Sequence, residues 1–162
     1  MSVWTSSQPF LPALLAILIA SGCSSSEQRP PLYPVTGILT INDQPADGAI
    51  IVLHPADGKD FDTRQTRPRA TVYPDGTFYV TTYQDADGAP AGDYHLAILW
   101  FDDPESSSTW DQLSGQFADP TKSQLKLSVQ EGDNQIPPFE LKDVTLQKTR
   151  PAKDPGDADQ VD

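Results

Sequence analysis

The sequence has few of the residues from which disulfides and catalytic centres are built. It contains one cysteine, one methionine and two histidines among its 162 residues. A single cysteine excludes an internal disulfide, and the chain has neither an H-E-x-x-H nor a G-x-S-x-G motif. Without a covalent or evident metal staple, the stability of any folded domain must come from a packed core.

Positive charge is also scarce. The chain has 11 lysines and arginines against 23 aspartates and glutamates, a formal net charge of −12, and every charged side chain follows Cys23. Nucleic-acid phosphates and anionic lipid headgroups attract Lys and Arg, so this balance argues against both as partners. We expect no nucleic-acid binding and a solvated, extracytoplasmic surface.

No apolar run is long enough to cross a bilayer. The longest, Phe10 to Ala20 (FLPALLAILIA), is interrupted only by Pro12, whereas a spanning helix needs about 20 apolar residues. Its length is typical of the apolar region of a signal peptide. Small residues follow it, including Ser21 and Gly22, and then comes Cys23.

This junction resembles the lipobox of bacterial lipoproteins, in which small residues precede an invariant cysteine. The resemblance implies cleavage between Gly22 and Cys23 and diacylation of the Cys23 sulfur. Two or three acyl chains hold a protein stably on a membrane. In such lipoproteins a serine after the cysteine accompanies sorting to the outer membrane, so with Ser24 the resemblance implies the outer membrane over the inner, on the periplasmic side or the cell surface. The alternative is a plain secretory signal with an incidental cysteine.

The mature region has the period of β-strands. Hydrophobic residues alternate in Val35–Ile41, Ala49–Leu53, Gly76–Tyr83, Asp93–Phe101 and Leu125–Val129. Four Asp-Gly pairs separate these runs, at 47–48, 57–58, 75–76 and 87–88, and Asp-Gly suits tight turns. The pattern predicts an all-β fold: a single seven-strand-type antiparallel β-sandwich, transthyretin-like or immunoglobulin-like.

The order of the motifs resembles the carboxypeptidase regulatory-domain-like, or transthyretin-like, lipoproteins that are abundant among planctomycetes. The motifs are YPVTGILTINDQPADGAIIVLHP, ATVYPDGTFYVTTY and DGAPAGDYHLAILW. Their order and spacing carry the resemblance, which covers residues 33–143. It implies a domain without catalytic residues. The predicted organisation is a signal peptide at 1–22, a lipidated cysteine and flexible tether at 23–32, this domain, and a disordered acidic tail at 144–162.

Candidate chemistry is sparse. His54 ends a predicted strand, and His95 alternates with the apolar face of another, so we expect it to point to solvent. For both residues a surface or strand-end histidine is preferred to a catalytic base. Loop carboxylates could ligate calcium, but they match only fragments of an EF-hand, so turns and solubility are preferred and no metal ligand is assigned. They are Asp57, Asp60, Asp62, Asp85, Asp87, Asp102, Asp103 and Glu105.

The long segment Asp102 to Gln124 carries the aromatic residues Trp110 and Phe117. Such side chains could stack on a sugar ring or anchor a protein partner, or they could fold back and cap the core. The sequence therefore predicts a non-catalytic, lipid-anchored envelope module without a cofactor, its partner an envelope protein or cell-wall glycan. The alternatives are a calcium-stabilised or carbohydrate-binding module and, less favoured, an envelope hydrolase.

Overall fold

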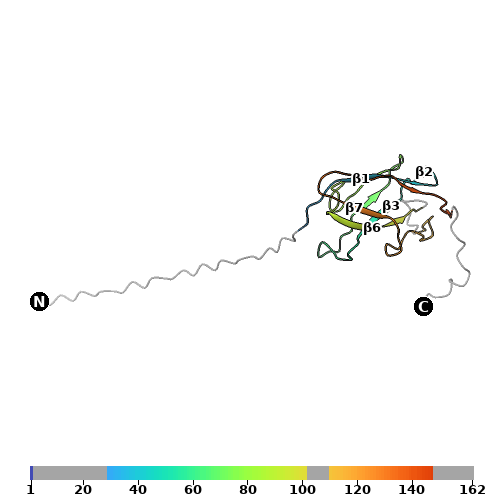
Figure 1. The fold of residues 1–162 in the computed structure, drawn as a ribbon. Coiled ribbons are helices and arrows are strands. Elements are labelled where there is room, and N and C mark those ends of the chain that lie inside the picture. The colour runs from blue at the N-terminus through green and yellow to red at the C-terminus, as the bar shows by residue number, and fades with distance from the viewer. Residues whose placement is uncertain (2–28, 102–109, 148–162) are drawn as a thin grey trace, which may run out of the picture.

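The computed structural model describes Met1, residues 29–101 and residues 110–147. Within these residues all regular structure is β-strand and no helix is present. Two sheets form the domain, with β1 and β2 in one layer and β3, β6 and β7 in the other (Figure 1). The strands are β1 (Val35–Ile41), β2 (Gln44–Pro45), β3 (Ile50–Pro55), β4 (Arg69–Thr71), β5 (Thr77–Tyr79), β6 (Gly92–Leu99), β7 (Lys126–Val129), β8 (Asn134–Gln135) and β9 (Phe139–Leu141).

The first sheet is built around β1. β2 and β5 pair antiparallel with it, whereas β8 and β9 pair parallel. The second sheet has the order β4-β3-β6-β7, and all its neighbours are antiparallel. The sheets meet at one edge, where isolated bridges join Arg69 to Thr81 and Val72 to Phe78. The predicted all-β, sandwich-like fold is confirmed at this level, although two of the strands beside β1 are parallel to it.

The core lies between the sheets and follows the alternation seen in the sequence. The predicted inward residues of three runs are buried: Val35, Leu39, Ile41, Ala49, Ile51, Leu53, Tyr94, Leu96 and Ile98. Each large aliphatic side chain buried in this way contributes about 1.5–3 kcal/mol. Trp100, next in the β6 series, is only partly buried. It packs against the core while its Nε1 donates a hydrogen bond to the Asp47 carbonyl at 2.8 Å.

In all four Asp-Gly pairs the glycine has a positive φ, between 71° and 89°, and each pair lies in a turn or directly follows one. At Gly88 space is restricted as well, because a Cβ built there would lie 1.9 Å from the Tyr33 carbonyl oxygen. Tyr33 and Ala89 exchange two backbone hydrogen bonds at this point, of 2.9 and 3.0 Å. The predicted turns are therefore confirmed, and one of them also fixes the start of the domain.

Two details differ from the sequence-based prediction. The described residues form nine strands, whereas the sequence predicts a seven-strand type; five of the nine, β2, β4, β5, β8 and β9, are only two or three residues long. The domain also extends beyond residue 143: Val144 is buried, Leu146 packs against the core, and the Gln147 N–H donates to the Gln112 carbonyl at 2.9 Å. Residues 144–147 thus belong to the domain and not to a tail. Residues 148–162 lie outside the described part of the chain.

Candidate functional site

The predicted anchor, Cys23, and the predicted cleavage residue Gly22 lie outside the described residues. The described part of the predicted tether begins at Arg29, whose guanidinium carbon lies 4.3 Å from the ring centroid of Tyr83. This cation–π contact brings residue 29 against the domain. Across the described residues, no helix is long and apolar enough to span a bilayer.

The loop that carries Trp110 and Phe117 is packed on the domain. Trp110 is half-buried, and Phe117 is a partly buried residue that contacts the core. Leu113, between them, is 1% exposed and belongs to the core itself. The described residues of this loop, 110–124, form turns and not a helix. This placement favours the capping interpretation of Trp110 and Phe117 over the partner-binding one.

Asp111 fixes this loop to the end of β6. Its Oδ1 accepts hydrogen bonds from the backbone N–H groups of Trp100 at 2.9 Å and Leu113 at 3.1 Å. Its Oδ2 accepts one from the Gly115 N–H at 2.9 Å. The Phe117 carbonyl in turn accepts from the Ile98 N–H at 2.9 Å. The loop therefore continues the hydrogen bonding of the second sheet.

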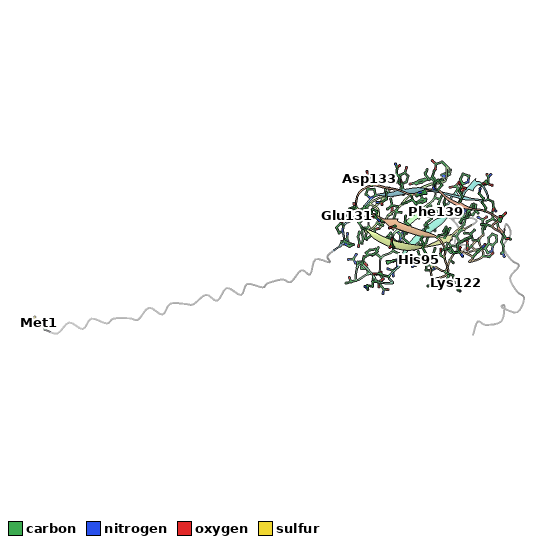
Figure 2. All side chains as sticks on the ribbon, viewed as in Figure 1. Met1, His95, Lys122, Glu131, Asp133 and Phe139 are labelled. Carbon is green, nitrogen blue, oxygen red and sulfur yellow. The ribbon has the colours of Figure 1, made fainter. Side chains whose placement is uncertain are left out.

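The two histidines, far apart in sequence, are cross-strand neighbours. His54 on β3 and His95 on β6 are register partners in the antiparallel pair, and both lie on the face away from the core. Directly opposite residues have Cβ atoms about 4.5–5.5 Å apart. Figure 2 labels His95 at the lower side of the domain. His95 is half-buried instead of solvent-exposed, and its Nδ1 is buried without a hydrogen-bond partner among the described residues.

These histidines line a cavity of about 410 Å³, together with Pro55, Ala56, Gly58, Arg67, Pro120 and Thr121. Partial burial and the nearby charge of Arg67 both lower the pKa of His54 from its usual value. Arg67 is itself ion-paired with Asp60, and its Nη1 donates to the carbonyls of Gln65 and Thr66 at 3.2 Å. No carboxylate lines this cavity, so the described residues offer neither histidine the acidic partner of a histidine–carboxylate pair.

A larger cavity, about 660 Å³, adjoins Pro55 and lies between the 55–61 loop and residues 90–94. Tyr94 forms part of its wall, but its hydroxyl donates to the Pro90 carbonyl at 2.7 Å. Burial, aided by the charge of Asp57, raises the pKa of Tyr94 to about 12. The phenol is therefore a structural hydrogen-bond donor and is not poised as an acid or base near neutral pH.

The loop carboxylates mostly accept hydrogen bonds from their own turns. Asp87 accepts from the N–H groups of Thr82, Tyr83 and Gln84 at 2.6 to 3.0 Å. Burial alone would raise the pKa of Asp62, but hydrogen bonds from Thr66, Tyr83 and Arg64 outweigh it and lower the pKa to about 2. Among the described residues no group of three or more His, Cys, Asp or Glu is arranged to hold a metal ion. Asp102, Asp103 and Glu105 lie outside them.

One surface feature was missed in the sequence. Tyr73 and Tyr79 are 51% and 47% exposed, and their rings meet edge to face with centroids 5.9 Å apart. Both tyrosines flank the predicted Asp75-Gly76 turn at outward positions of the alternation. That pattern is visible in the sequence, but single exposed tyrosines are too common to indicate a binding surface on their own.

Comparison with protein-family models, with curated proteins and with solved structures finds no match to this chain. The fold class therefore rests on the strands and their pairing, and the role of the protein has to be argued from its residues.

Proposed function

We propose that this chain is a lipid-anchored, non-catalytic module of the bacterial cell envelope that acts by binding other envelope components. The observation that carries the proposal is the placement of Cys23. It follows Ser21 and Gly22 at the end of the apolar run, about ten residues before the first strand pairing at Tyr33. Acylation at that point would suspend a folded β-domain from the membrane by a short tether.

The interior and the cavities of the domain support a binding role over a catalytic one. Among the described residues the buried side chains are apolar. In the cavity lined by His54 and His95 (the histidine cavity), His54 has a lowered pKa, and Asp60, which does not line the cavity, is ion-paired with Arg67. A hydrolase would need a nucleophile or activated water beside such a base. We also propose that the domain is of the carboxypeptidase regulatory-like type, on the motif order described above.

The proposed lipid anchor is tested by substituting Cys23. Cys23→Ala expressed in a diderm bacterium should lose incorporation of radiolabelled palmitate and leave the membrane fraction, or accumulate as the unprocessed precursor. Ser25→Ala, two residues along the same tether, should be processed and labelled as the parent chain is. Membrane recovery of Cys23→Ala with an unchanged acyl label would overturn the proposal.

A further inference from the structure

The exposed tyrosines lie in a cleft at the edge where the two sheets meet. We call it the tyrosine cleft; it is about 190 Å³ in volume and is lined by Arg69, Ala70, Thr71, Tyr73, Tyr79, Thr81 and Asp85. Backbone pairing holds its walls, since Arg69 and Thr81 exchange two hydrogen bonds of 2.7 and 2.9 Å. The backbone N–H of Tyr73 donates a hydrogen bond to the Thr77 carbonyl at 2.8 Å. Four of the lining residues, at 69–71 and 79, lie on strands, and backbone hydrogen bonds hold Tyr73 and Thr81 beside them, so binding requires less ordering than it would on a mobile loop.

The cleft gathers most of the exposed large apolar surface of the domain. Apart from Met1, the exposed large hydrophobic residues in the described part of the chain are Ile38, Tyr73 and Tyr79. Ile38 is the register partner of Thr77, so it lies on the same outward face of β1 and β5, beside the cleft. Grouped exposed aromatics on a domain whose core is otherwise well buried mark an interaction surface.

The polar residues around the rings decide what kind of ligand fits. Arg69 and Asp85 are exposed, and neither forms an ion pair within the described residues. A guanidinium donates two parallel hydrogen bonds and a carboxylate accepts two, so each matches a pair of neighbouring hydroxyls. The threonines at 71 and 81 add hydroxyl groups to the same walls.

From these features we infer that the tyrosine cleft binds a neutral oligosaccharide. One face of a pyranose ring carries C–H groups that pack on an aromatic face, while its rim carries the hydroxyls that Arg69 and Asp85 would bind. At about 190 Å³ the cleft is smaller than pockets for drug-sized ligands, which are about 300–1,000 Å³. It would therefore hold one ring of the oligosaccharide. The net charge of −12 argues against uronate-rich or sulfated chains. The inference rests on the proposed binding role and names its ligand class.

The test measures binding of cellohexaose and chitohexaose to the purified full-length protein by titration calorimetry, in a detergent without a sugar headgroup. We expect saturable binding to one of the two. Tyr73→Ala and Tyr79→Ala should each weaken it at least about tenfold, which corresponds to about 1.4 kcal/mol, while Tyr79→Phe should stay within about threefold. Glu140→Gln, on β9, is the distant control and should bind as the parent does. Thermal unfolding of every variant checks that the fold is intact.

Polygalacturonate, titrated in the same way, is the anionic comparison. Several outcomes would overturn the inference: no saturable binding to either neutral sugar, equal binding by the alanine variants, or tighter binding of polygalacturonate. Acyl labelling of the same preparations separates this result from the proposed function. Labelled protein that ignores the sugars contradicts the cleft and leaves the anchor standing. Shortened sugars recovered after incubation would instead contradict the non-catalytic role.

Discussion

Gly37 shows how a single residue can be dictated by the residue across the sheet. It lies in the middle of β1 without a positive φ, so backbone conformation does not explain the glycine. Its register partner is Phe78, and a Cβ built on Gly37 would lie 2.5 Å from Cζ and 2.7 Å from Cε1 of that ring. The aromatic ring therefore covers the glycine and fills the space that a side chain would take. Phe78 is itself 1% exposed and cannot move outward freely.

Gly37→Ala should lower the free energy of unfolding by about 1–3 kcal/mol, because overpacking a filled site displaces Phe78. Urea denaturation measures the change. Phe78→Leu should cost less in the Gly37→Ala background than in the parent chain, since the smaller side chain leaves room for the methyl group. Additive effects in this double-mutant cycle would show that the ring and the glycine are not coupled.

At the scale of elements, the loop after β6 is held by the carboxylate of Asp111 as well as by its packed side chains. The carboxylate of Asp111 accepts three backbone hydrogen bonds, from the N–H groups of Trp100, Leu113 and Gly115. These bonds position Leu113 in the core, so the loop and the sheet are expected to unfold together.

Asp111→Ala should therefore destabilise the domain by about 1–3 kcal/mol, because the part-buried N–H groups of Trp100 and Leu113 lose their acceptor. Asp111→Asn keeps one acceptor oxygen and should cost less. Gln116→Ala, an exposed position in the same loop, should change stability by less than about 0.5 kcal/mol. Hydrogen exchange of the Leu113 and Gly115 amides should accelerate only in the Asp111 variants. Unchanged exchange there would contradict the assigned role.

Elements that bury an alternating face could be predicted, and those defined by pairing alone could not. The run Val35–Ile41 was predicted with the bounds that β1 has, because every inward side chain in it is apolar or glycine. β8 is Asn134–Gln135, two polar residues that are a strand only because β1 supplies hydrogen-bond partners. The neighbouring positions of His54 and His95 depend likewise on the register of β3 against β6. Register follows from turns and packing together, so neither histidine's sequence context showed it.

At the scale of the whole molecule, the two sheets are joined through loops whose polar contacts depend on protonation. Tyr83, in the segment after β5, donates to Asp62 at 2.9 Å, which connects that segment to the loop between β3 and β4. The pKa of Asp62, about 2, lies below its usual value of 3.8. Hydrogen bonds from Thr66, Tyr83 and Arg64 lower that pKa, so together they contribute stability above pH 4 that is lost as the pH falls toward 2. The histidine cavity adds a second pH dependence, in a higher range.

The second dependence of folding stability on pH comes from His54. Desolvation and the charge of Arg67 lower its pKa in the folded state, whereas the unfolded chain binds a proton near the usual value of 6.5. Below pH 6.5 the unfolded state therefore binds more protons than the folded state, so stability falls as the pH drops from about 7.5 to 5.5. The groups that face His54 are Arg67, with its partner Asp60, and His95 across the strand pair.

His54→Gln should flatten the dependence of the free energy of unfolding on pH in this range, because the substituted side chain does not titrate. Urea denaturation at half-unit steps of pH measures the slope for the parent and the variant. Lys126→Gln on β7 removes a cation at the register partner of His95 and serves as the electrostatic control; it should keep most of the parent slope. If His54→Gln and the parent lose the same stability between pH 7.5 and 5.5, the proton uptake on unfolding belongs to other groups, and the desolvated state of His54 does not affect the fold.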